Sequence, residues 1–272
     1  MRFDLSKVEY SKYDLRTNVK VPSHLTQKLA YLSGIHLGDG TMNHYLKYYY
    51  SIGYSGHLID EFEFYTAQFK PLFLSLFHKN LFVYKRIRPG KQSVDLSAQS
   101  KAIFTFLTTS LHIPPGPKDN ASIPELIKNS KYALSFMKGL ADSDFSLMFK
   151  KNSKGIHVYP TIFLNSSNSL FLSQVNTLLY RHGFNSHTLF DFPKKRYDKL
   201  YISNQLEILG VEQLERWMKK IGFDSPKHLT KYFIWKKFGF CPPYTTLFER
   251  QLILKGELDP YSFYQKPFSK SL

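Results

Sequence analysis

Two acidic side chains occupy matching places in a repeated segment of the chain. The segment YLSGIHLGDGTM (31–42) has a counterpart in FMKGLADSDFSL (136–147), and Asp39 and Asp144 stand 105 positions apart within this repeat. A single short motif of this kind is weak evidence, but two copies at one constant offset indicate an internal duplication. Paired carboxylates can bind divalent cations, and such a site is suited to the hydrolysis of phosphodiesters.

A helix is expected to carry each aspartate. Apolar residues at helical spacing predict a first helix from about Leu25 to Gly38, and Thr26 is suited to cap its N-terminus. Gly34 costs about 1 kcal/mol relative to alanine within a helix, so we expect a second backbone to approach closely there. Gly139, at the same offset of 105 positions, is the expected partner. Helices packed at these glycines would bring their C-terminal ends together.

The C-terminal end of a helix is an unfavourable place for a carboxylate, because it lies at the negative end of the helix dipole. Two carboxylates brought together there would repel, so a divalent cation is the expected compensation. As a single residue, Asp39 ahead of Gly40 would also be typical of a turn, but its repetition at Asp144 favours a shared role. We interpret the nearby Asp142 as a hydrogen-bonding or solvated group. The spacing of GIHLGDG (34–40) does not fit a phosphate-binding glycine loop.

The repeat extends well beyond the two motifs. Each copy predicts, in order, a helix, two strands, a helix, two strands and a final helix. After the motif helices, the predicted elements are strands within 44–54 and 156–165, helices at about 58–78 and 168–182, hairpins at 82–97 and 189–203, and helices at 100–111 and 205–221. The predicted fold class is α+β, with two pseudo-symmetric αββαββα halves packed through their motif helices.

The expected joint between the halves lies within residues 112–130, where four prolines interrupt regular structure. The predicted organisation is a lead-in over 1–24, a first half over 25–125, a second half over 126–237, and an extension over 238–272 with one short helix near 245–255.

Basic residues are in clear excess. The 272 residues include 37 Lys and Arg against 21 Asp and Glu, a formal charge of +16. Such a charge attracts polyanions, and nucleic acid is favoured over an anionic membrane because no amphipathic helix with one basic face is evident. The single cysteine, Cys241, excludes a disulfide framework and a cysteine-based zinc site. With no signal-peptide pattern and no apolar run long enough to span a bilayer, we expect an intracellular protein that is neither secreted nor membrane-bound.

The two predicted hairpins are basic and are the expected nucleic-acid-binding elements. Side chains alternate between the faces of a strand, and a twisted basic sheet can read bases in the major groove and hold phosphates. An ordinary solvated sheet face is the alternative. The residues expected to contact DNA are Tyr84, Lys85, Arg86 and Arg88 in the first half, and Lys150, Lys151, Lys194, Lys195, Arg196, Tyr197, Lys199 and Tyr201 in the second.

The segments LSGIHLGDG (32–40) and MKGLADSDF (137–145) resemble the two motifs of the LAGLIDADG homing endonuclease family, and the resemblance covers roughly residues 24–237. In that family the motif helices form the interface between two αββαββα halves, and the last aspartate of each motif binds the catalytic metals. The resemblance implies a monomer, with Mg²⁺ as cofactor and Mn²⁺ able to replace it. The metal-binding positions so implied are Asp39, Asp144, Gly38 and Ser143, and the catalytic residues are Asp39, Asp144, Lys118 and Lys227, with the lysines beside the scissile phosphates.

The implied function is sequence-specific cleavage of both strands of double-stranded DNA, at a long and nearly asymmetric site, by metal-dependent hydrolysis. The alternative is a LAGLIDADG protein that has lost catalysis and serves as an intron RNA maturase or a transcription regulator, with host intron RNA as a partner. Two departures from the family pattern are His36-Leu37, where Ile-Asp is frequent, and Phe145 in place of a terminal glycine. The family also supplies a water-positioning polar side chain in each half, for which the candidates are Ser55 or His57 and Asn165 or Ser166.

Overall fold

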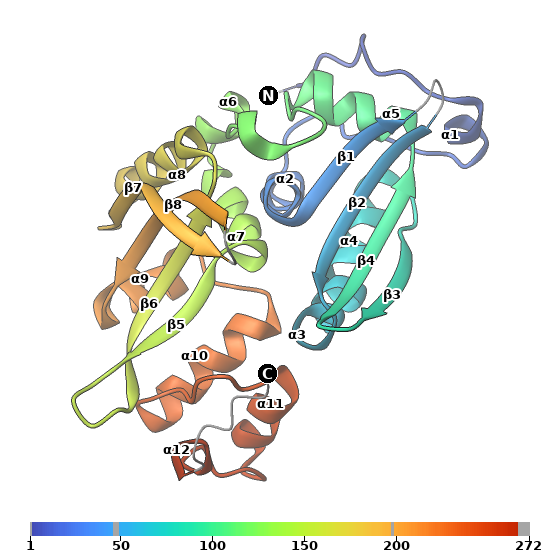
Figure 1. Cartoon of the computed structure of the whole chain (residues 1–272). Coiled ribbons are helices and arrows are strands. Elements are labelled where there is room, and N and C mark those ends of the chain that lie inside the picture. Colours follow the sequence, from blue (N-terminus) through green and yellow to red (C-terminus); the bar gives the residue numbers. More distant parts are fainter. Residues whose placement is uncertain (1, 46–48, 197–198, 266–272) are drawn as a thin grey trace.

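Two four-stranded antiparallel sheets, together with the helices packed on them, make up most of the molecule (Figure 1). The structure is a computed structural model that describes residues 2–45, 49–196 and 199–265. The arrangement in two similar halves confirms the predicted α+β class. No helix within the described ranges is long and apolar enough to cross a membrane.

The first half follows the predicted order of elements. It consists of α2 (Gln27–Asp39), β1 (Gly40–Tyr45), β2 (Tyr49–His57), α3 (Leu58–Glu63), α4 (Lys70–Phe77), β3 (Phe82–Arg88), β4 (Lys91–Gln99) and α5 (Lys101–Thr105), followed in the proline-rich joint by a 3₁₀ turn (Lys118–Asn120) and α6 (Glu125–Lys128). A π-helical segment (Phe64–Phe69) joins α3 to α4, and a second one (Phe106–Ser110) follows α5. The helices predicted at 58–78 and 100–111 are therefore present, each with a π-helical part.

The second half repeats this order and adds one helix after it, with two corrections to the predicted boundaries. Its first strand lies at 146–151, ahead of the predicted 156–165, and its last strand extends into the predicted final helix. It consists of α7 (Ala133–Ser143), β5 (Ser146–Lys151), β6 (His157–Ser166), α8 (Ser169–Arg181), β7 (His187–Arg196), β8 (Lys199–Leu209), α9 (Val211–Lys220) and α10 (Pro226–Phe238). The prediction of a helix from residue 205 was wrong, because β8 continues to residue 209. Leu206 and Ile208 are buried while Glu207 is only half-buried, which is the alternation of a strand. The strand orders, β1-β2-β4-β3 and β5-β6-β8-β7, are the same in both sheets.

Helices α2 and α7 pack against each other where the two halves meet (Figure 1). A Cβ atom on Gly34 would lie 2.1 Å from the carbonyl oxygen of Phe136, and one on Gly139 would lie 1.9 Å from that of Tyr31. Each glycine therefore allows the backbone of the opposite helix to approach, as expected from the repeat. We call this contact the α2–α7 seam, and it fixes the C-terminal ends of both helices relative to each other.

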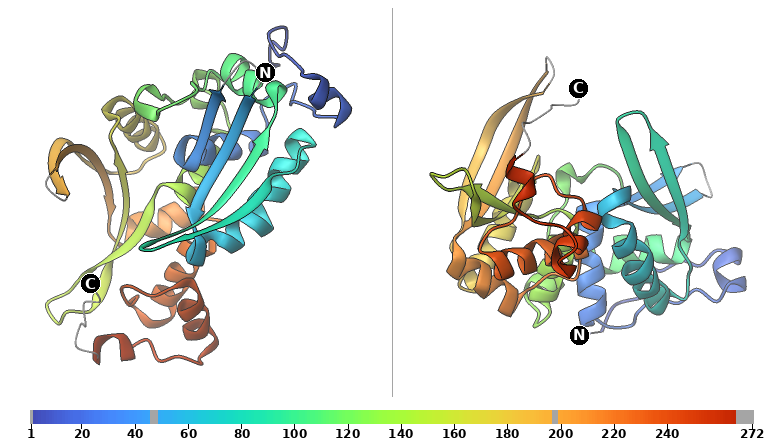
Figure 2. Two further views of the ribbon diagram at one scale, coloured as in Figure 1. Left: turned by 45° about the vertical axis from the view of Figure 1, so that its right-hand side comes forward. Right: turned by 90° about the horizontal axis from the view of Figure 1, so that it is seen from below.

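Within the described residues, helices pack against one face of each sheet and leave the other face uncovered (Figure 1). In the first sheet Ile52, Val94 and Leu96 are buried on the helix side. Strand alternation places the paired residues Ser55 and Asp95 on the opposite face, which we call the open face. Figure 2 shows the β3–β4 and β7–β8 hairpins projecting in the same direction on either side of the α2–α7 seam. The open faces are thus available to a large partner.

The two chain ends add short helices to this framework. The lead-in contains α1 (Lys12–Arg16), which Ser11 caps. The extension contains α11 (Leu247–Lys255), at the place where a short helix was predicted, and α12 (Ser262–Gln265). Helix α11 packs on α10 of the second half and also contacts α3 of the first half. The extension therefore touches both halves.

Candidate active site

The carboxyl groups of Asp39 and Asp144 meet at the end of the α2–α7 seam. Asp39 is the last residue of α2, and Asp144 is the C-cap of α7, where its N–H donates to the carbonyl oxygen of Leu140. A Cβ atom on Gly38 would lie 3.3 Å from Cγ of Asp144, so this carboxyl group lies against the backbone next to Asp39. The two motif aspartates, one from each half, therefore belong to one group of residues, which we call the acid cluster.

Burial and mutual repulsion raise the pKa of both carboxyl groups. The pKa of Asp39 rises to about 7, first because the group is buried and then because Asp144 and Glu61 carry like charge. Burial also raises the pKa of Asp144, while the charges of Lys118 and Lys227 lower it. Asp144 remains open to solvent although protein atoms crowd it, so water screens part of its charge. Both groups would be stabilised as carboxylates by a bound cation.

Two side chains from the helical segment after β2 complete the acid cluster. Tyr65 donates a hydrogen bond of 2.6 Å from its hydroxyl to Oδ2 of Asp39. Glu61 lies one helical turn earlier and pairs through Oε1 with Nζ of Lys227 at 2.6 Å. Neither residue was predicted from the sequence. A sequence signal for Tyr65 was the glycine at position 56 in strand β2, because a glycine within a strand can indicate the close approach of another group. In the structure that group is the Tyr65 ring, whose Cε2 would lie 2.4 Å from a Cβ atom on Gly56.

Both predicted lysines join the acid cluster, one from each half. Lys118 lies within the proline-rich joint and donates from Nζ to the carbonyl oxygen of Gly38. Burial lowers the pKa of Lys118, and the charges of the two aspartates oppose this effect. Lys227 lies in the first turn of α10 and pairs with Glu61. The two ammonium groups therefore have different partners, a main-chain carbonyl for one and a carboxylate for the other.

The donor set of the acid cluster fits a hard, oxygen-preferring divalent cation such as Mg²⁺. Three carboxyl groups face two ammonium groups, so ionised carboxylates leave negative charge uncompensated. Within the described ranges, no three His, Cys, Asp or Glu side chains are grouped to hold a metal by themselves. A cation would therefore also need main-chain oxygens and water as ligands. Among the predicted positions, the Ser143 hydroxyl already donates to two carbonyl oxygens of α7 at 3.1 Å, which leaves the main-chain oxygen of Ser143 as a metal ligand. A cation at the main-chain oxygen of Gly38 would share that oxygen with the Lys118 ammonium group.

Asp142, the competing carboxylate, has a separate structural role. It is buried and accepts hydrogen bonds at 2.9 Å from the N–H groups of Asp224 and Ser225, and one at 2.7 Å from the Tyr31 hydroxyl. Burial raises the pKa of Asp142 to about 7, although these hydrogen bonds lower it. Of the two interpretations of this residue, the hydrogen-bonding one is therefore confirmed. Its contacts tie α2 and α7 to the segment that leads into α10.

The open face of the first sheet carries several of the residues predicted to contact DNA. Arg86 pairs through Nε with Asp95 at 3.0 Å, and the Ser55 hydroxyl donates to the same carboxylate at 2.6 Å. Tyr84 and Arg88 are exposed and, by strand alternation, lie on the same face as Arg86. This hairpin thus presents aromatic and basic side chains on one surface.

Lys85 is an exception among the predicted contacts. It alternates with Tyr84 and Arg86 along β3, and its ammonium group lies 4.5 Å from the centre of the Phe62 ring. Phe62 belongs to α3, on the helix-covered side of the sheet. This position does not support a DNA contact, because strand alternation directs Lys85 away from the open face.

The second sheet carries the other predicted contacts. Lys150 pairs with Glu207 at 3.0 Å, and Lys151 and Lys195 are exposed. In the β7–β8 hairpin the backbone pairs Lys194 with Tyr201 and Arg196 with Lys199. Tyr197 lies outside the described residues.

The side chains of the four candidates for positioning water have hydrogen-bond partners outside the acid cluster, although the main-chain N–H of His57 donates to Glu61. The partners are the Asp95 carboxylate for Ser55, the Asp60 N–H for His57, the Ser203 hydroxyl for Asn165 and the Asn168 N–H for Ser166. These contacts do not involve Asp39 or Asp144, so the water-positioning role of these candidates stays a prediction.

Comparison with solved structures shows the fold of the chain. No family model matches the chain, and no curated protein sequence matches it. The structure of the homing endonuclease I-DmoI in complex with DNA and Ca is 14% identical to this chain, covers 76% of it and 97% of its own length, and has a TM-score of 0.50. The DNA-bound homing endonucleases I-WcaI and I-GzeII are 13% and 9% identical, cover 78% and 89% of this chain and 87% and 95% of their own, and have TM-scores of 0.49 and 0.48. With two αββαββα halves joined at their motif helices, this chain has the fold of the LAGLIDADG homing endonucleases, in the form that carries both halves in one polypeptide.

Proposed function

We propose that this chain is a sequence-specific DNA endonuclease that hydrolyses one phosphodiester bond in each strand of a duplex with the help of divalent metal ions. The observation that carries the proposal is the meeting of Asp39 and Asp144, one from each half, in one cluster with Lys118 and Lys227. I-DmoI, which shares the fold, is a homing endonuclease crystallised with DNA and Ca, and this supports the same class of substrate. Because one chain supplies both acids, a monomer suffices.

The residues of the acid cluster have complementary tasks in such a reaction. Asp39 and Asp144 would hold Mg²⁺, which activates water and stabilises the leaving oxygen when bound. The ammonium groups of Lys118 and Lys227 place positive charge where the phosphate oxygens gain negative charge. Tyr65 orients the Asp39 carboxylate through its hydrogen bond and favours the ionised form of that group.

The open faces of the two sheets supply the DNA-binding surface. The formal charge of +16 attracts the phosphate backbone, and exposed Arg88 and Tyr84 lie beside Arg86 on the first of these faces. Asp95 holds the Arg86 guanidinium in one orientation, which suits the reading of a base edge. The matching face of the second half carries Lys150 paired with Glu207. Because matching positions of the halves carry different side chains, the expected target is long and nearly asymmetric.

The proposal is tested by replacing each aspartate with asparagine, which keeps the shape and removes the charge. A plasmid library with a randomised insert is first incubated with wild-type protein and Mg²⁺, and the cut ends are sequenced to find the target. We expect Asp39→Asn and Asp144→Asn each to lower double-strand cleavage by at least about a hundredfold, with DNA binding retained. Asp259→Asn is the matched control, because Asp259 is an exposed turn residue in the extension.

Two outcomes would contradict this proposal. Retained cleavage in both aspartate variants would refute the assignment of the acids. A wild-type protein that binds intron RNA or duplex DNA but cuts no member of the library would favour the non-catalytic alternative, a maturase or a regulator.

A further inference from the structure

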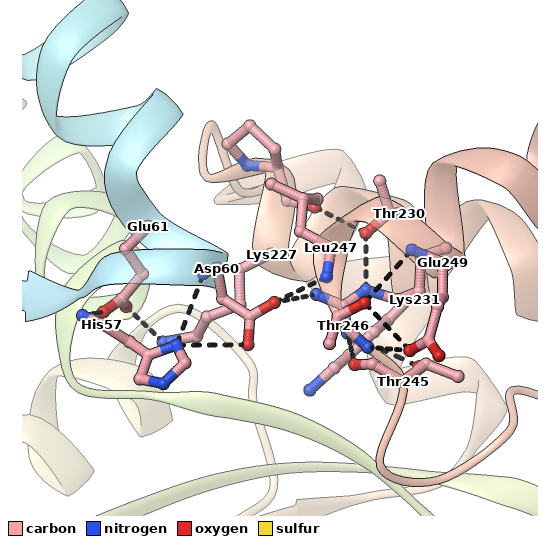
Figure 3. A network of polar contacts seen from close by, with 12 residues as sticks. His57, Asp60, Glu61, Lys227, Thr230, Lys231, Thr245, Thr246, Leu247 and Glu249 are labelled. Atoms are coloured by element: carbon pink, nitrogen blue, oxygen red, sulfur yellow. Dashed lines mark hydrogen bonds and ion pairs between the residues drawn. The ribbon is translucent and has the colours of Figure 1, made fainter. Parts of the chain in front are cut away.

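A buried ion pair joins the C-terminal extension to the first half (Figure 3). Nη2 of Arg250 in α11 lies 3.2 Å from Oδ1 of Asp60 in α3, and only 1% of the Arg250 side chain is exposed. The main-chain N–H of Leu247 donates to the same carboxylate oxygen at 2.6 Å. A buried guanidinium is costly unless it is paired. This contact therefore fixes the extension to α3.

Arg250 also binds the second half. Its Nε donates to Oγ1 of Thr230 in α10 at 2.9 Å, and Nη1 donates to the carbonyl oxygen of Thr245. The guanidinium thus connects α3, α10 and the segment before α11. Its planar fork of donors makes the connection rigid. We call the connection from Asp60 through Arg250 to Thr230 the strut.

The residue next to Asp60 faces the acid cluster. Glu61 pairs with Lys227 at 2.6 Å, and their side chains are 8% and 20% exposed. Successive residues of α3 therefore hold α10 at two points, Asp60 through the strut and Glu61 through Lys227 (Figure 3). Because Lys227 and Thr230 are about one helical turn apart, both points lie on the same side of α10.

The other lysine of the acid cluster is held differently. Lys118 donates to the carbonyl oxygen of Gly38, and its own carbonyl oxygen accepts a hydrogen bond of 3.1 Å from Nδ2 of Asn168. Neither contact involves the extension. A change in the strut should therefore act on Lys227 and leave Lys118 in place.

We propose that Asp60 and Arg250 are positioning residues that hold the Glu61–Lys227 pair at the acid cluster, so that the extension controls cleavage of one of the two DNA strands. This inference rests on the proposed function. The two halves are related by approximate twofold symmetry, as are the strands of a duplex, so each lysine serves a different strand. Loss of the strut would separate α3 from α10 and displace the Lys227 ammonium group. The strand served by Lys118 would be cut as before.

Two substitutions test the strut. Asp60→Asn keeps the shape and an acceptor oxygen but removes the charge, and Arg250→Met removes the guanidinium. Lys236→Met is the matched control, because it removes an exposed ion pair with Glu215, of 2.8 Å, from the same helix α10. Thermal unfolding and DNA binding show which variants fold. If Arg250→Met does not fold, the strand rates of Asp60→Asn decide the test. A duplex that carries the selected target, labelled on either strand, gives a separate rate for each strand.

We expect both strut variants to cut one strand about tenfold more slowly or worse, which is typical when the partner of a catalytic group is lost. The other strand should keep its rate, so that nicked DNA accumulates, and Lys236→Met should keep both rates. Hydrogen exchange at residues 57–63 should also become faster in the folded strut variants. Folded variants that keep the wild-type ratio of strand rates would overturn this inference alone. A wild type that cuts neither strand would refute the proposed function, and this inference with it.

Discussion

The hydroxyl of Tyr65 lies 2.6 Å from Oδ2 of Asp39, although Tyr65 belongs to a π-helical segment outside the repeated motif. This hydrogen bond lowers the pKa of Asp39, against the burial and the like charges that raise it. The ring of Tyr65 also lies so close to Gly56 that a side chain there would collide with it. Through Tyr65, the packing of β2 against the following helix influences the charge of a motif aspartate.

Tyr65→Phe should shift the acidic limb of the cleavage profile to higher pH. The variant keeps the ring but loses a hydrogen bond to a charged group, which contributes about 1.5–3 kcal/mol. Since one pKa unit corresponds to about 1.4 kcal/mol, the pKa of Asp39 should rise by about one unit or more. Cleavage rates measured from neutral to mildly alkaline pH test this. Tyr232→Phe, which loses a bond to Glu215 on the far side of the second half, is the control, and an unshifted limb in Tyr65→Phe would contradict the prediction.

Asp39 should progressively destabilise the metal-free protein as pH rises from about 4 to about 7, whereas buried His36, whose pKa is lowered to about 3, acts in the opposite direction. The pKa of Asp39 is raised from 3.8 to about 7 in the folded chain, so between these values the unfolded chain releases a proton that the folded chain keeps. The contribution of Asp39 to the free energy of unfolding is complete below pH 3.8 and is lost as pH rises to about 7. No further loss from Asp39 is expected above pH 7. Asp142 acts in the same direction. Thermal unfolding across this range should show the Tm of Asp39→Asn rising relative to that of the wild type, and a constant difference in Tm would argue against the raised pKa.

Divalent cations should raise Tm, and more strongly at pH 7 and above, because they bind the ionised aspartates. A ligand at a hundred times its Kd stabilises the folded state by about 2.7 kcal/mol, which corresponds to several degrees for a chain of this size. Removal of the cation with a chelator should reverse the shift. The double variant Asp39→Asn with Asp144→Asn should lose the response. The same rise of Tm in the double variant would place the cation elsewhere.

Gly139→Ala should loosen the α2–α7 seam. Its Cβ atom would lie 1.9 Å from the carbonyl oxygen of Tyr31, so the helices must separate. Overpacking of this kind costs about 1–3 kcal/mol of the free energy of unfolding, and cleavage should fall because the acids move apart. Urea unfolding and cleavage rates measure both effects. Ser135→Ala on the same helix is the control, and a Gly139→Ala protein as stable and active as this control would show that the seam tolerates a side chain.

Arg86→Met should weaken DNA binding, whereas Lys85→Met should not. Arg86 lies on the open face, and Lys85 stacks over Phe62 on the opposite side of the same strand. If Arg86 contacts a phosphate, its loss reduces the slope of log Kd against log salt by about one. If Arg86 reads a base, the substitution weakens the binding free energy by about 1–3 kcal/mol for the selected target and leaves the binding of unrelated DNA unchanged. Equal effects of the two substitutions would exclude this hairpin face as the binding surface.

Much of the framework was predictable because its determinants are local and occur twice. The equal spacing of Gly34 and Gly139 in the two copies of the repeat predicts that the two helices pack at these glycines. The aspartates follow each glycine at the same distance along the same helices. Helical and strand periods predicted most element boundaries. The end of β8 was misplaced because Leu206 and Ile208 fit a helical pattern as well as a strand when read without their pairing partners.

The missed residues depend on contacts between distant parts of the chain. Glu61 and Tyr65 reach the acid cluster only because the helix after β2 packs beside α10 and α2, and Gly56 within β2 is the one sequence feature that we connect with this packing. Asp60 and Arg250 are 190 positions apart, and their pairing depends on the path of the extension. Lys85 and Arg86 carry the same charge, but the alternation of side chains along the strand, which is readable in the sequence, places them on opposite faces, so the inclusion of Lys85 was avoidable.

The separation of Asp39 and Asp144, the acids of the proposed reaction, is a property of the protein interior. It is set by two glycines in contact, whereas the choice of target is set by side chains on the sheet surfaces far from that contact. An endonuclease built in this way keeps a constant stagger between its two cuts, and therefore a constant overhang, whichever base pairs its hairpins are altered to recognise.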